Sequence, residues 1–312
     1  MQLEYFRADV GNFGDDLNRW IWSRFQPDLF DEDGSVRFLG IGTIIGLPLP
    51  EATQRVVVFS SGIGYRPPPG ASALPHEYVA VRGPLTAKVL GLSADVAQGD
   101  GALLLPLLPE FAPLPEAQRS GTIFVPHWEK MDDQVLLAAA RSAGLEVVDP
   151  RQDPETVIQR LRSASKVIAD SMHAAIIADA LGVPWVPVAT SRNISSFKWI
   201  DWASSLGVPY EPTLLPQGTT QMALRSLLKR RVVGTQFTGS GKEAALANYR
   251  ALAQRIAAPD FEKARYKGFH RVDRLVDLSK STWLRPGVAQ FLDKRRAERL
   301  VAQLQRASER AG

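Results

Sequence analysis

The sequence has 312 residues, of which 45% are hydrophobic and 22% charged, and this composition is typical of a soluble globular protein. A chain of this length can bury two cores of ordinary size, so we expect two domains. It contains no cysteine, which excludes disulfides, cysteine nucleophiles and cysteine-ligated zinc. The N-terminus lacks a basic segment followed by an apolar run, and no window is apolar enough to span a membrane, so secretion is not expected.

Charge is divided unevenly along the chain. Residues 1–224 carry 17 Lys and Arg against 25 Asp and Glu, whereas residues 225–312 carry 20 against 8, within a net charge of +4. Such a basic C-terminal region points to an anionic partner, either a membrane surface or nucleic acid. A solvated helical face would give the same composition.

The first part of the chain alternates short apolar runs with loops. Strands are predicted at 3–7, 36–39, 55–59 and 77–82, and glycine-rich loops at 11–18, 40–42 and 60–64. Such runs are typical of parallel strands buried on both faces, whose carboxyl ends form one rim facing a ligand. The first loop is expected to lead into a helix over 17–25. Its Asp15 and Asp16 would repel a phosphate, so they suit sugar hydroxyls or helix capping.

Arg82 ends the predicted strand 77–82, just before a helix predicted over 85–90. A guanidinium at this place can hold a carboxylate or a phosphate in bidentate fashion, and a surface ion pair is the alternative. The run Asp100–Leu105 predicts a further strand. Four prolines then fall close together, so we interpret residues 106–119 as a linker between two domains.

The second part alternates strands and helices, which predicts a parallel, doubly wound sheet. Strands are expected at 122–125, 145–148, 167–169 and 185–188, and helices at 132–143, 154–164 and 174–181. His173 falls in the first turn of the last helix, at the carboxyl edge of a strand, where helix-start amides favour an anion. A capping or buried histidine is the alternative. His127 follows another strand, and Arg192 and Lys198 come from a loop and helix that are expected to face the same pocket as His173.

Beyond residue 216 only helical patterns remain. They cover 222–232, 243–257 and 288–307, and none has the large apolar face that membrane insertion needs. The chain has no Gly-X-Ser-X-Gly elbow, no His-Glu-X-X-His helix and no Walker A loop. Its four histidines are dispersed, so no metal site is predicted.

Six short blocks occur in the order and spacing of the polysaccharide pyruvyl transferases. They are Asn12-Phe-Gly-Asp-Asp16, Phe38-Leu-Gly-Ile-Gly-Thr43, Phe59-Ser-Ser-Gly-Ile63, Arg82-Gly-Pro84, Asp100-Gly-Ala102, and Ser171-Met-His173 followed by Gly182-Val-Pro184. Over residues 1–206 the chain therefore resembles this family, in particular its exopolysaccharide branch near the xanthan ketal pyruvate transferases.

The resemblance implies an α/β fold of two Rossmann-like domains facing a cleft, as in type B glycosyltransferases. The acceptor-side domain would span 1–112 and the donor-side domain 113–216, with a basic helical region over 217–312. The implied reaction joins pyruvate from phosphoenolpyruvate, without a cofactor, to two hydroxyls of a sugar and releases phosphate. We expect a 4,6-type ketal on a terminal mannose of a lipid-linked exopolysaccharide repeat unit.

The family's donor-binding Arg, His and Lys fall on Arg82, His173 and Lys198. Many relatives carry Ser-X-Arg-X-His, whereas this chain has only Ser171-Met-His173, and Arg192 is our candidate for the role of the missing arginine. The predicted donor-binding residues are Arg82, His127, Ser171, Arg192 and Lys198.

His173 is expected to act as general acid or to stabilise the leaving phosphate. Asp15 or Asp16 would orient or deprotonate the acceptor hydroxyl. The predicted acceptor-binding residues are Asn12, Asp15, Asp16 and Gly62.

Two other functions fit parts of the sequence. A type B glycosyltransferase would need a nucleotide-sugar pocket, and no acidic ribose-binding residue stands in a convincing place. A noncatalytic anion- or nucleic-acid-binding protein would use the basic region, but an RNA-binding motif is missing, so no nucleic acid partner is expected. We expect a cytoplasmic protein, with residues 225–312 close to anionic lipid at the inner membrane.

Overall fold

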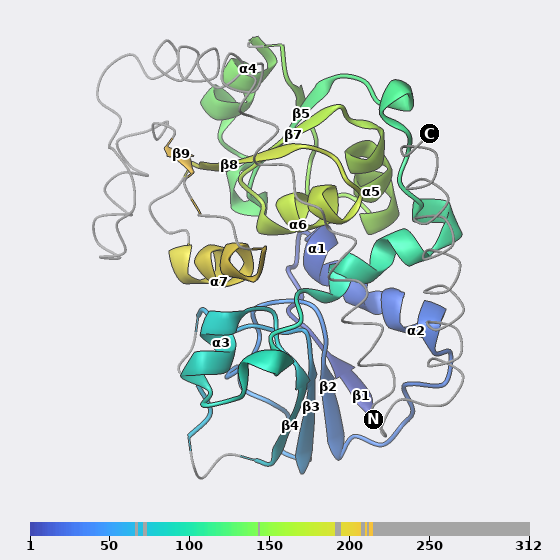
Figure 1. The fold of residues 1–312 in the computed structure, drawn as a ribbon, viewed down its shortest axis with the longest axis vertical. Coiled ribbons are helices and arrows are strands. Elements are labelled where there is room, and N and C mark those ends of the chain that lie inside the picture. The colour runs from blue at the N-terminus through green and yellow to red at the C-terminus, as the bar shows by residue number, and fades with distance from the viewer. Residues whose placement is uncertain are drawn as a thin grey trace, which may run out of the picture.

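The computed structural model describes residues 1–65, 68–70, 74–142, 144–190, 195–206, 210 and 212–214. These residues form an α/β fold with two sheets, which lie in the lower and upper halves of Figure 1. Arg192 and the helices predicted beyond residue 216 lie outside the described residues. The domain boundaries at 112 and 216 and the type B glycosyltransferase arrangement therefore stay predictions.

Both sheets are parallel, as the alternation of strands and helices predicted. The first has the order β1-β2-β3-β4 and the second the order β6-β5-β7-β8-β9. The strands are β1 (Gln2–Glu4), β2 (Val36–Leu39), β3 (Arg55–Phe59), β4 (His76–Ala80), β5 (Thr122–Val125), β6 (Glu146–Val147), β7 (Lys166–Ala169), β8 (Trp185–Ala189) and β9 (Thr213–Leu214). The short β9 was not predicted, because two residues carry too little pattern.

Helices follow most strands. They are α1 (Phe13–Asp16), α2 (Ile21–Phe25), α3 (Pro84–Val89), α4 (Gln134–Ser142), α5 (Pro154–Ser163), α6 (Met172–Ala180) and α7 (Ser196–Leu206). Short 3-10 helices are η1 (Leu17–Arg19), η2 (Ala94–Val96), η3 (Gly101–Leu107), η4 (Pro109–Phe111), η5 (Glu116–Gln118) and η6 (Trp128–Lys130).

Two predictions of local structure were wrong. The loop expected over 11–18 already turns into helix α1 at Phe13, because Phe13 is fully buried and Gly11, with φ +85°, supplies the turn in two residues. The strand expected over Asp100–Leu105 is the 3-10 helix η3. Its first turn is capped by Asp100, whose Oδ1 accepts a hydrogen bond of 3.0 Å from the Ala102 amide.

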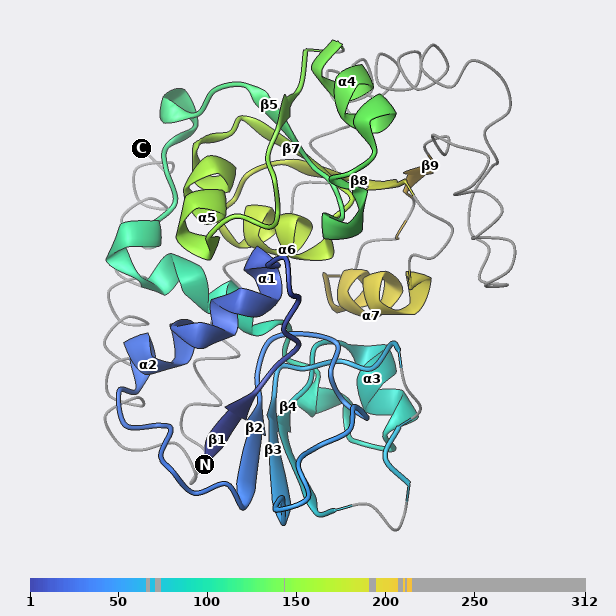
Figure 2. The ribbon, with the colours of Figure 1, turned by 180° about the vertical axis from the view of Figure 1, so that it is seen from behind.

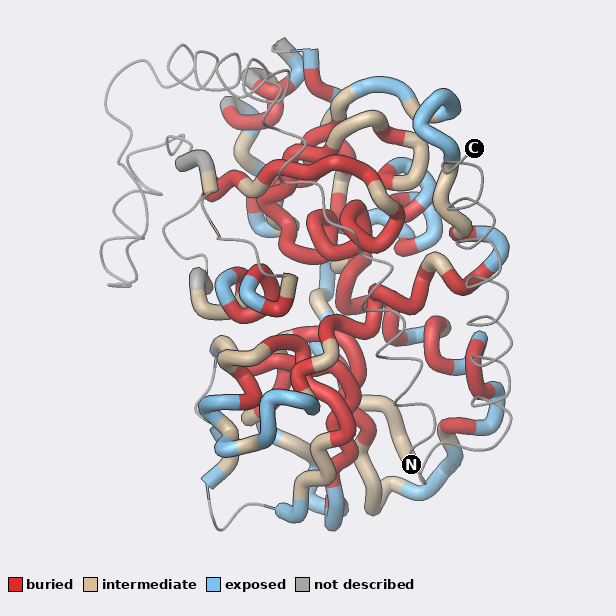
Figure 3. Tube along the Cα trace, in the orientation of Figure 1, coloured by how far each residue is buried: buried red, intermediate tan, exposed pale blue. Residues whose placement is uncertain are grey.

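One hydrophobic core joins the two sheets. It contains Phe38 of β2, Leu104 of η3 and Ile177 of α6, and η3 packs directly against α6. Figure 3 shows the buried chain continuing from one sheet through these segments to the other. The segment predicted as a linker, 106–119, does connect the sheets, but its Leu107 and Phe111 are buried in this core.

The carboxyl edges of the two sheets face each other (Figure 2). A Cβ atom built on Gly14, which follows β1, would overlap the ring of His173, which follows β7. The Ser195 hydroxyl, which follows β8, donates a 3.2 Å hydrogen bond to the carbonyl of Gly64, which follows β3. Loops from both edges therefore meet in one region, and α7 lies between the sheets in both views. In the described part of the chain, no helix has the length and hydropathy of a membrane span.

Candidate active site

His173 lies in the first turn of α6, where the sequence predicted it. Its ring packs on the backbone of Gly14 in α1, so closely that a Cβ atom on Gly14 would lie 2.0 Å from His173 Nδ1. The residue is only 8% exposed, and its Nε2 atom has no hydrogen-bond partner among the described residues. A buried nitrogen without a partner is costly, so this atom is suited to a hydrogen bond with a ligand.

Burial, and after it the positive charges of Lys198 and Arg82, lowers the pKa of His173 to about 3. The imidazole is therefore neutral at neutral pH. A negatively charged ligand beside it would oppose both cations and would raise this pKa. The protonation state of His173 thus depends on what binds next to it.

Asp15 projects from α1 and is 8% exposed. Its Oδ2 atom accepts a 2.5 Å hydrogen bond from Asn12 Nδ2. The pKa of Asp15 is raised to about 7. Burial is the main cause, Lys198 opposes it, and the neighbouring carboxylates Asp100 and Asp16 contribute to the rise in pKa. A carboxyl group that titrates near neutral pH is suited to acid–base chemistry.

Asp16 has different surroundings from Asp15. Its Oδ1 atom forms a 2.8 Å ion pair with Arg19 Nη2, and its Oδ2 atom accepts a 3.0 Å hydrogen bond from the Asn12 amide. Asp16 therefore holds the start of its own helix, as the capping alternative predicted. Of the two carboxylates, Asp15 is the one placed among the other candidate residues.

Lys198 projects from α7 towards the first sheet. Its Nζ atom lies 2.7 Å from the Tyr65 hydroxyl and 5.2 Å from the centroid of the Tyr65 ring. Its charge lowers the pKa of Asp15, His127 and His173, so it is the cation common to these groups. The sequence predicted that Lys198 faces the same region as His173, and this position agrees with it.

His127 and Ser171 lie at the carboxyl ends of β5 and β7. The ring of His127 is 26% exposed, and burial followed by the charges of Lys198 and Lys130 lowers its pKa to about 3. Its amide donates a 3.0 Å hydrogen bond to Asp170 Oδ2, which also accepts one of 2.5 Å from the hydroxyl of Thr190, the residue after β8. The buried Asp170 thus ties three strand ends together, while Ser171 precedes α6.

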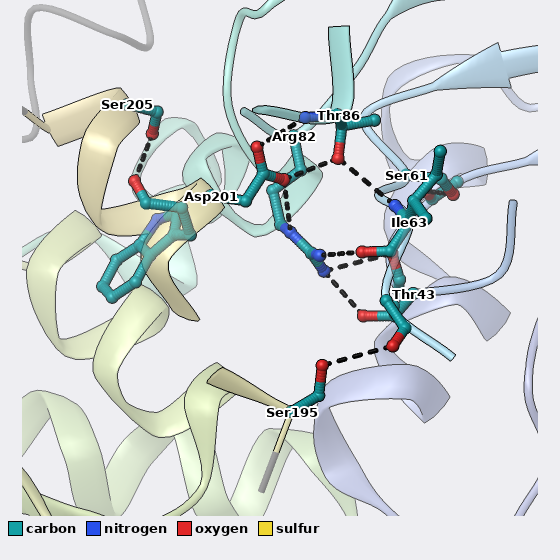
Figure 4. A network of polar contacts seen from close by, with 12 residues as sticks. Thr43, Ser61, Ile63, Arg82, Thr86, Ser195, Asp201 and Ser205 are labelled. Atoms are coloured by element: carbon teal, nitrogen blue, oxygen red, sulfur yellow. Dashed lines mark hydrogen bonds and ion pairs between the residues drawn. The ribbon is translucent and has the colours of Figure 1, made fainter. Parts of the chain in front are cut away.

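Arg82 is fully buried, which contradicts the surface ion pair considered from the sequence. Its Nη1 atom donates to Thr43 Oγ1 at 2.8 Å, its Nη2 atom to the Ile63 carbonyl at 3.4 Å, and its Nε atom lies 3.7 Å from Asp201 Oδ2 (Figure 4). A Cβ atom on Gly62 would lie 2.3 Å from the guanidinium. In this structure Arg82 supports the loops around the site, and the binding roles of Arg82 and Gly62 stay predictions.

Sequence reasoning missed three residues that belong to this region. Asp100 is fully buried, and burial raises its pKa to about 6. Tyr65 contacts Lys198, and Asp201 contacts Arg82. Asp100 lies in one of the six family blocks and so could have been found, whereas the partners of Tyr65 and Asp201 are set by tertiary packing alone.

Within the described ranges, no three His, Cys, Asp or Glu side chains are placed to hold a metal ion. The side chains gathered between the sheets are instead carboxyl groups, imidazoles and a lysine. Their chemistry is proton transfer and the binding of anions.

Parallel sheets whose strand ends bring ionisable side chains together define an α/β enzyme of the type that binds its ligand at this edge. A family model described as polysaccharide pyruvyl transferase matches residues 31–192, which is more than half of the chain. The chain is also 38% identical over 242 residues to the succinoglycan biosynthesis protein ExoV of Rhizobium meliloti (strain 1021), covering 77% of this chain and 73% of that protein.

The chain therefore belongs to the polysaccharide pyruvyl transferase family, and the resemblance seen in the six blocks is confirmed. It is a pyruvyl transferase enzyme of exopolysaccharide biosynthesis. The nucleotide-sugar transferase and the noncatalytic protein are set aside. The comparison with solved structures gave no significant match.

Proposed function

We propose that the enzyme uses phosphoenolpyruvate as donor and forms a cyclic pyruvate ketal on a sugar of an exopolysaccharide repeat unit. The observation that carries this proposal is the meeting of His173, Asp15 and Lys198 between the carboxyl edges of the two sheets. One cation, one imidazole with a free nitrogen and one carboxyl group that titrates near pH 7 match the needs of this reaction.

The reaction adds two hydroxyl groups to one carbon. Protonation of the methylene carbon of phosphoenolpyruvate makes a methyl group and leaves positive charge on the neighbouring carbon. One sugar hydroxyl attacks that carbon, the C–O bond to phosphate breaks, and the second hydroxyl closes the ring. Of the two hydroxyl protons, the methyl group gains one and phosphate the other, so no further co-reactant and no separate cofactor are needed.

Each of the three residues has a role in this scheme. Lys198 binds the negative charge of the donor. The Nε2 atom of His173 forms a hydrogen bond with the phosphate. The negative charge of the donor raises the pKa of His173, so that the imidazole can carry a proton as phosphate leaves. Asp15 accepts the proton of the attacking hydroxyl, which its pKa of about 7 favours.

The acceptor is proposed to be a lipid-linked repeat unit with a terminal mannose, modified as a 4,6-type ketal. Support for an exopolysaccharide acceptor comes from the relative named for succinoglycan biosynthesis. Kinship with the xanthan enzymes, on which the choice of mannose depends, stays a prediction. We further propose one domain around each sheet, cytoplasmic location, and contact of the basic residues 225–312 with anionic lipid.

Calorimetric titration tests the donor. Phosphoenolpyruvate should bind saturably, and nucleotide sugars at the same salt concentration should not.

His173→Ala should abolish phosphate release in the presence of acceptor, because the residue contacts the donor, while the circular dichroism spectrum stays unchanged. His76→Ala is the matched control, since His76 starts β4 at the end remote from the site and should keep its activity. Saturable binding of a nucleotide sugar alone, or wild-type turnover by His173→Ala, would contradict the proposal.

A further inference from the structure

Helix α7 follows β8 of the second sheet, and the centroid of its Trp202 ring lies 5.2 Å from that of Trp185 in β8, but three polar contacts tie it to the first sheet. Ser195, just before the helix, donates a hydrogen bond to the Gly64 carbonyl, and Lys198 donates one to the Tyr65 hydroxyl. Asp201 accepts one from the amide of Thr86 at the start of α3, which packs on α7. The spacing of three residues places Lys198 and Asp201 on one face of the helix. This face is directed at the loops that follow β3 and β4.

Asp201 makes the most deeply buried of these contacts. Its side chain is fully buried; Oδ1 accepts a 2.9 Å hydrogen bond from the Thr86 amide and Oδ2 one of 2.7 Å from the Thr86 hydroxyl. The close approach depends on Gly83, since a Cβ atom there would lie 2.2 Å from the Asp201 carbonyl oxygen. A buried carboxylate is unfavourable unless hydrogen bonds and an opposite charge compensate it, and here Arg82 supplies the charge.

Arg82 links Asp201 to the opposite side of the site. Its guanidinium donates to Thr43 Oγ1 and to the Gly42 carbonyl. Gly42 lies beside the Asp15 carboxylate: a Cβ atom on Gly42 would be 3.1 Å from Asp15 Oδ1. Figure 4 shows this network from Asp201 through Arg82 to the loop at Thr43. One carboxylate therefore connects the helix that carries Lys198 with the loop that packs on Asp15.

We infer that Asp201 is a positioning residue, which holds α7 on the first sheet so that Lys198 stays close to Asp15 and His173. This inference rests on the proposed function, because it takes Lys198 as a donor-binding cation. Asp201 does not touch the donor. It acts by anchoring the helix that carries Lys198, so that the flexible four-carbon side chain of the lysine starts from a fixed backbone position.

A double-mutant cycle measured by calorimetry tests this inference. Asp201→Asn keeps the size of the side chain and removes its charge, and it should weaken phosphoenolpyruvate binding about tenfold. In a Lys198→Ala background the same substitution should change binding by less than about threefold, because the cation it positions is gone. Equal effects in both backgrounds would overturn the inference.

Asp179→Asn is the matched control. Asp179 is also a buried helical carboxylate, but its Oδ1 atom accepts a 3.1 Å hydrogen bond from Trp185 of β8, in the second sheet. This variant should bind phosphoenolpyruvate as the wild type does. If Asp201→Asn does not fold, Thr86→Val removes the hydroxyl half of the same anchor from the other side, and the cycle with Lys198→Ala is run with that variant.

Hydrogen exchange separates failure of the inference from failure of the proposed function. In Asp201→Asn the amides of α7 should exchange at least about tenfold faster than in the wild type, while those of α5 stay unchanged. Unchanged exchange in α7 would overturn the anchoring role, whether or not the donor binds. If the wild type does not bind phosphoenolpyruvate at all, the proposed donor is wrong, and the exchange result alone then decides whether Asp201 holds α7.

Discussion

Substituting Asp15 by Asn should stabilise the protein above neutral pH and abolish ketal formation. Burial raises the pKa of Asp15 from 3.8 to about 7. Between these two values the folded protein keeps a proton that the unfolded chain has lost, so the free energy of unfolding falls as the pH rises. Asparagine does not titrate, so the variant escapes this loss.

The size of the effect follows from the shift. About three pH units at about 1.36 kcal/mol per unit correspond to about 4 kcal/mol at pH 8 and to almost nothing near pH 4. The variant gains less than this, because the hydrogen bond from Asn12 then reaches a neutral amide oxygen instead of a carboxylate. We expect a net gain of about 2 kcal/mol at pH 8 and a change within about 1 kcal/mol at pH 4.

Urea unfolding followed by tryptophan fluorescence at pH 4 and pH 8 measures the difference. Asp16→Asn is the control, because its carboxylate is paired with Arg19 and its removal should stabilise the protein at neither pH. If Asp15→Asn changes the free energy of unfolding equally at both values, burial does not raise the pKa of Asp15 and the reasoning fails. A stabilised variant that still forms ketal at the wild-type rate would remove Asp15 from the proposed mechanism.

Further substitutions test the other contacts of the site. Lys198→Met should raise the pKa of both His173 and Asp15, since the charge of Lys198 lowers both. An NMR titration of the histidine ring signals measures the pKa of His173. If the pKa of His173 is the same in this variant as in the wild type, Lys198 and His173 are not neighbours. Gly14→Ala places a methyl group 2.0 Å from His173 Nδ1 and should cost about 2 kcal/mol of stability together with donor binding. Gly34→Ala, whose Cβ would lie 3.5 Å from its nearest neighbour, should change neither, and equal losses in the two alanine variants would refute the close packing at Gly14.

Most strands and helices were predictable from local patterns. The apolar run at Arg55–Phe59 and the alternation after residue 122 carry their own signals, because burial on both faces of a parallel strand requires consecutive apolar residues. The run Asp100–Leu105 misled the prediction. A short apolar run fits a strand and a buried helix equally well, and its contact with α6, which decided between them, is remote in sequence.

The candidate site was predictable in its parts. His173, His127 and Arg82 each follow a strand or end one, and local chain order is enough to place them at the carboxyl edge of a sheet. The resemblance to the family added a donor-binding role for Lys198. The sequence by itself thus determined the family, the parallel α/β fold and the edge at which the ionisable residues collect.

The tertiary structure decided how these residues meet and how they titrate. It buried Arg82 against Asp201, set the ring of His173 on Gly14 and held Lys198 beside Tyr65. It also paired Asp16 with Arg19 and placed Asp15, its neighbour in the chain, near Lys198. A pKa depends on burial and on charges from distant segments, and both arise only when the two sheets come together, so no local pattern encodes them.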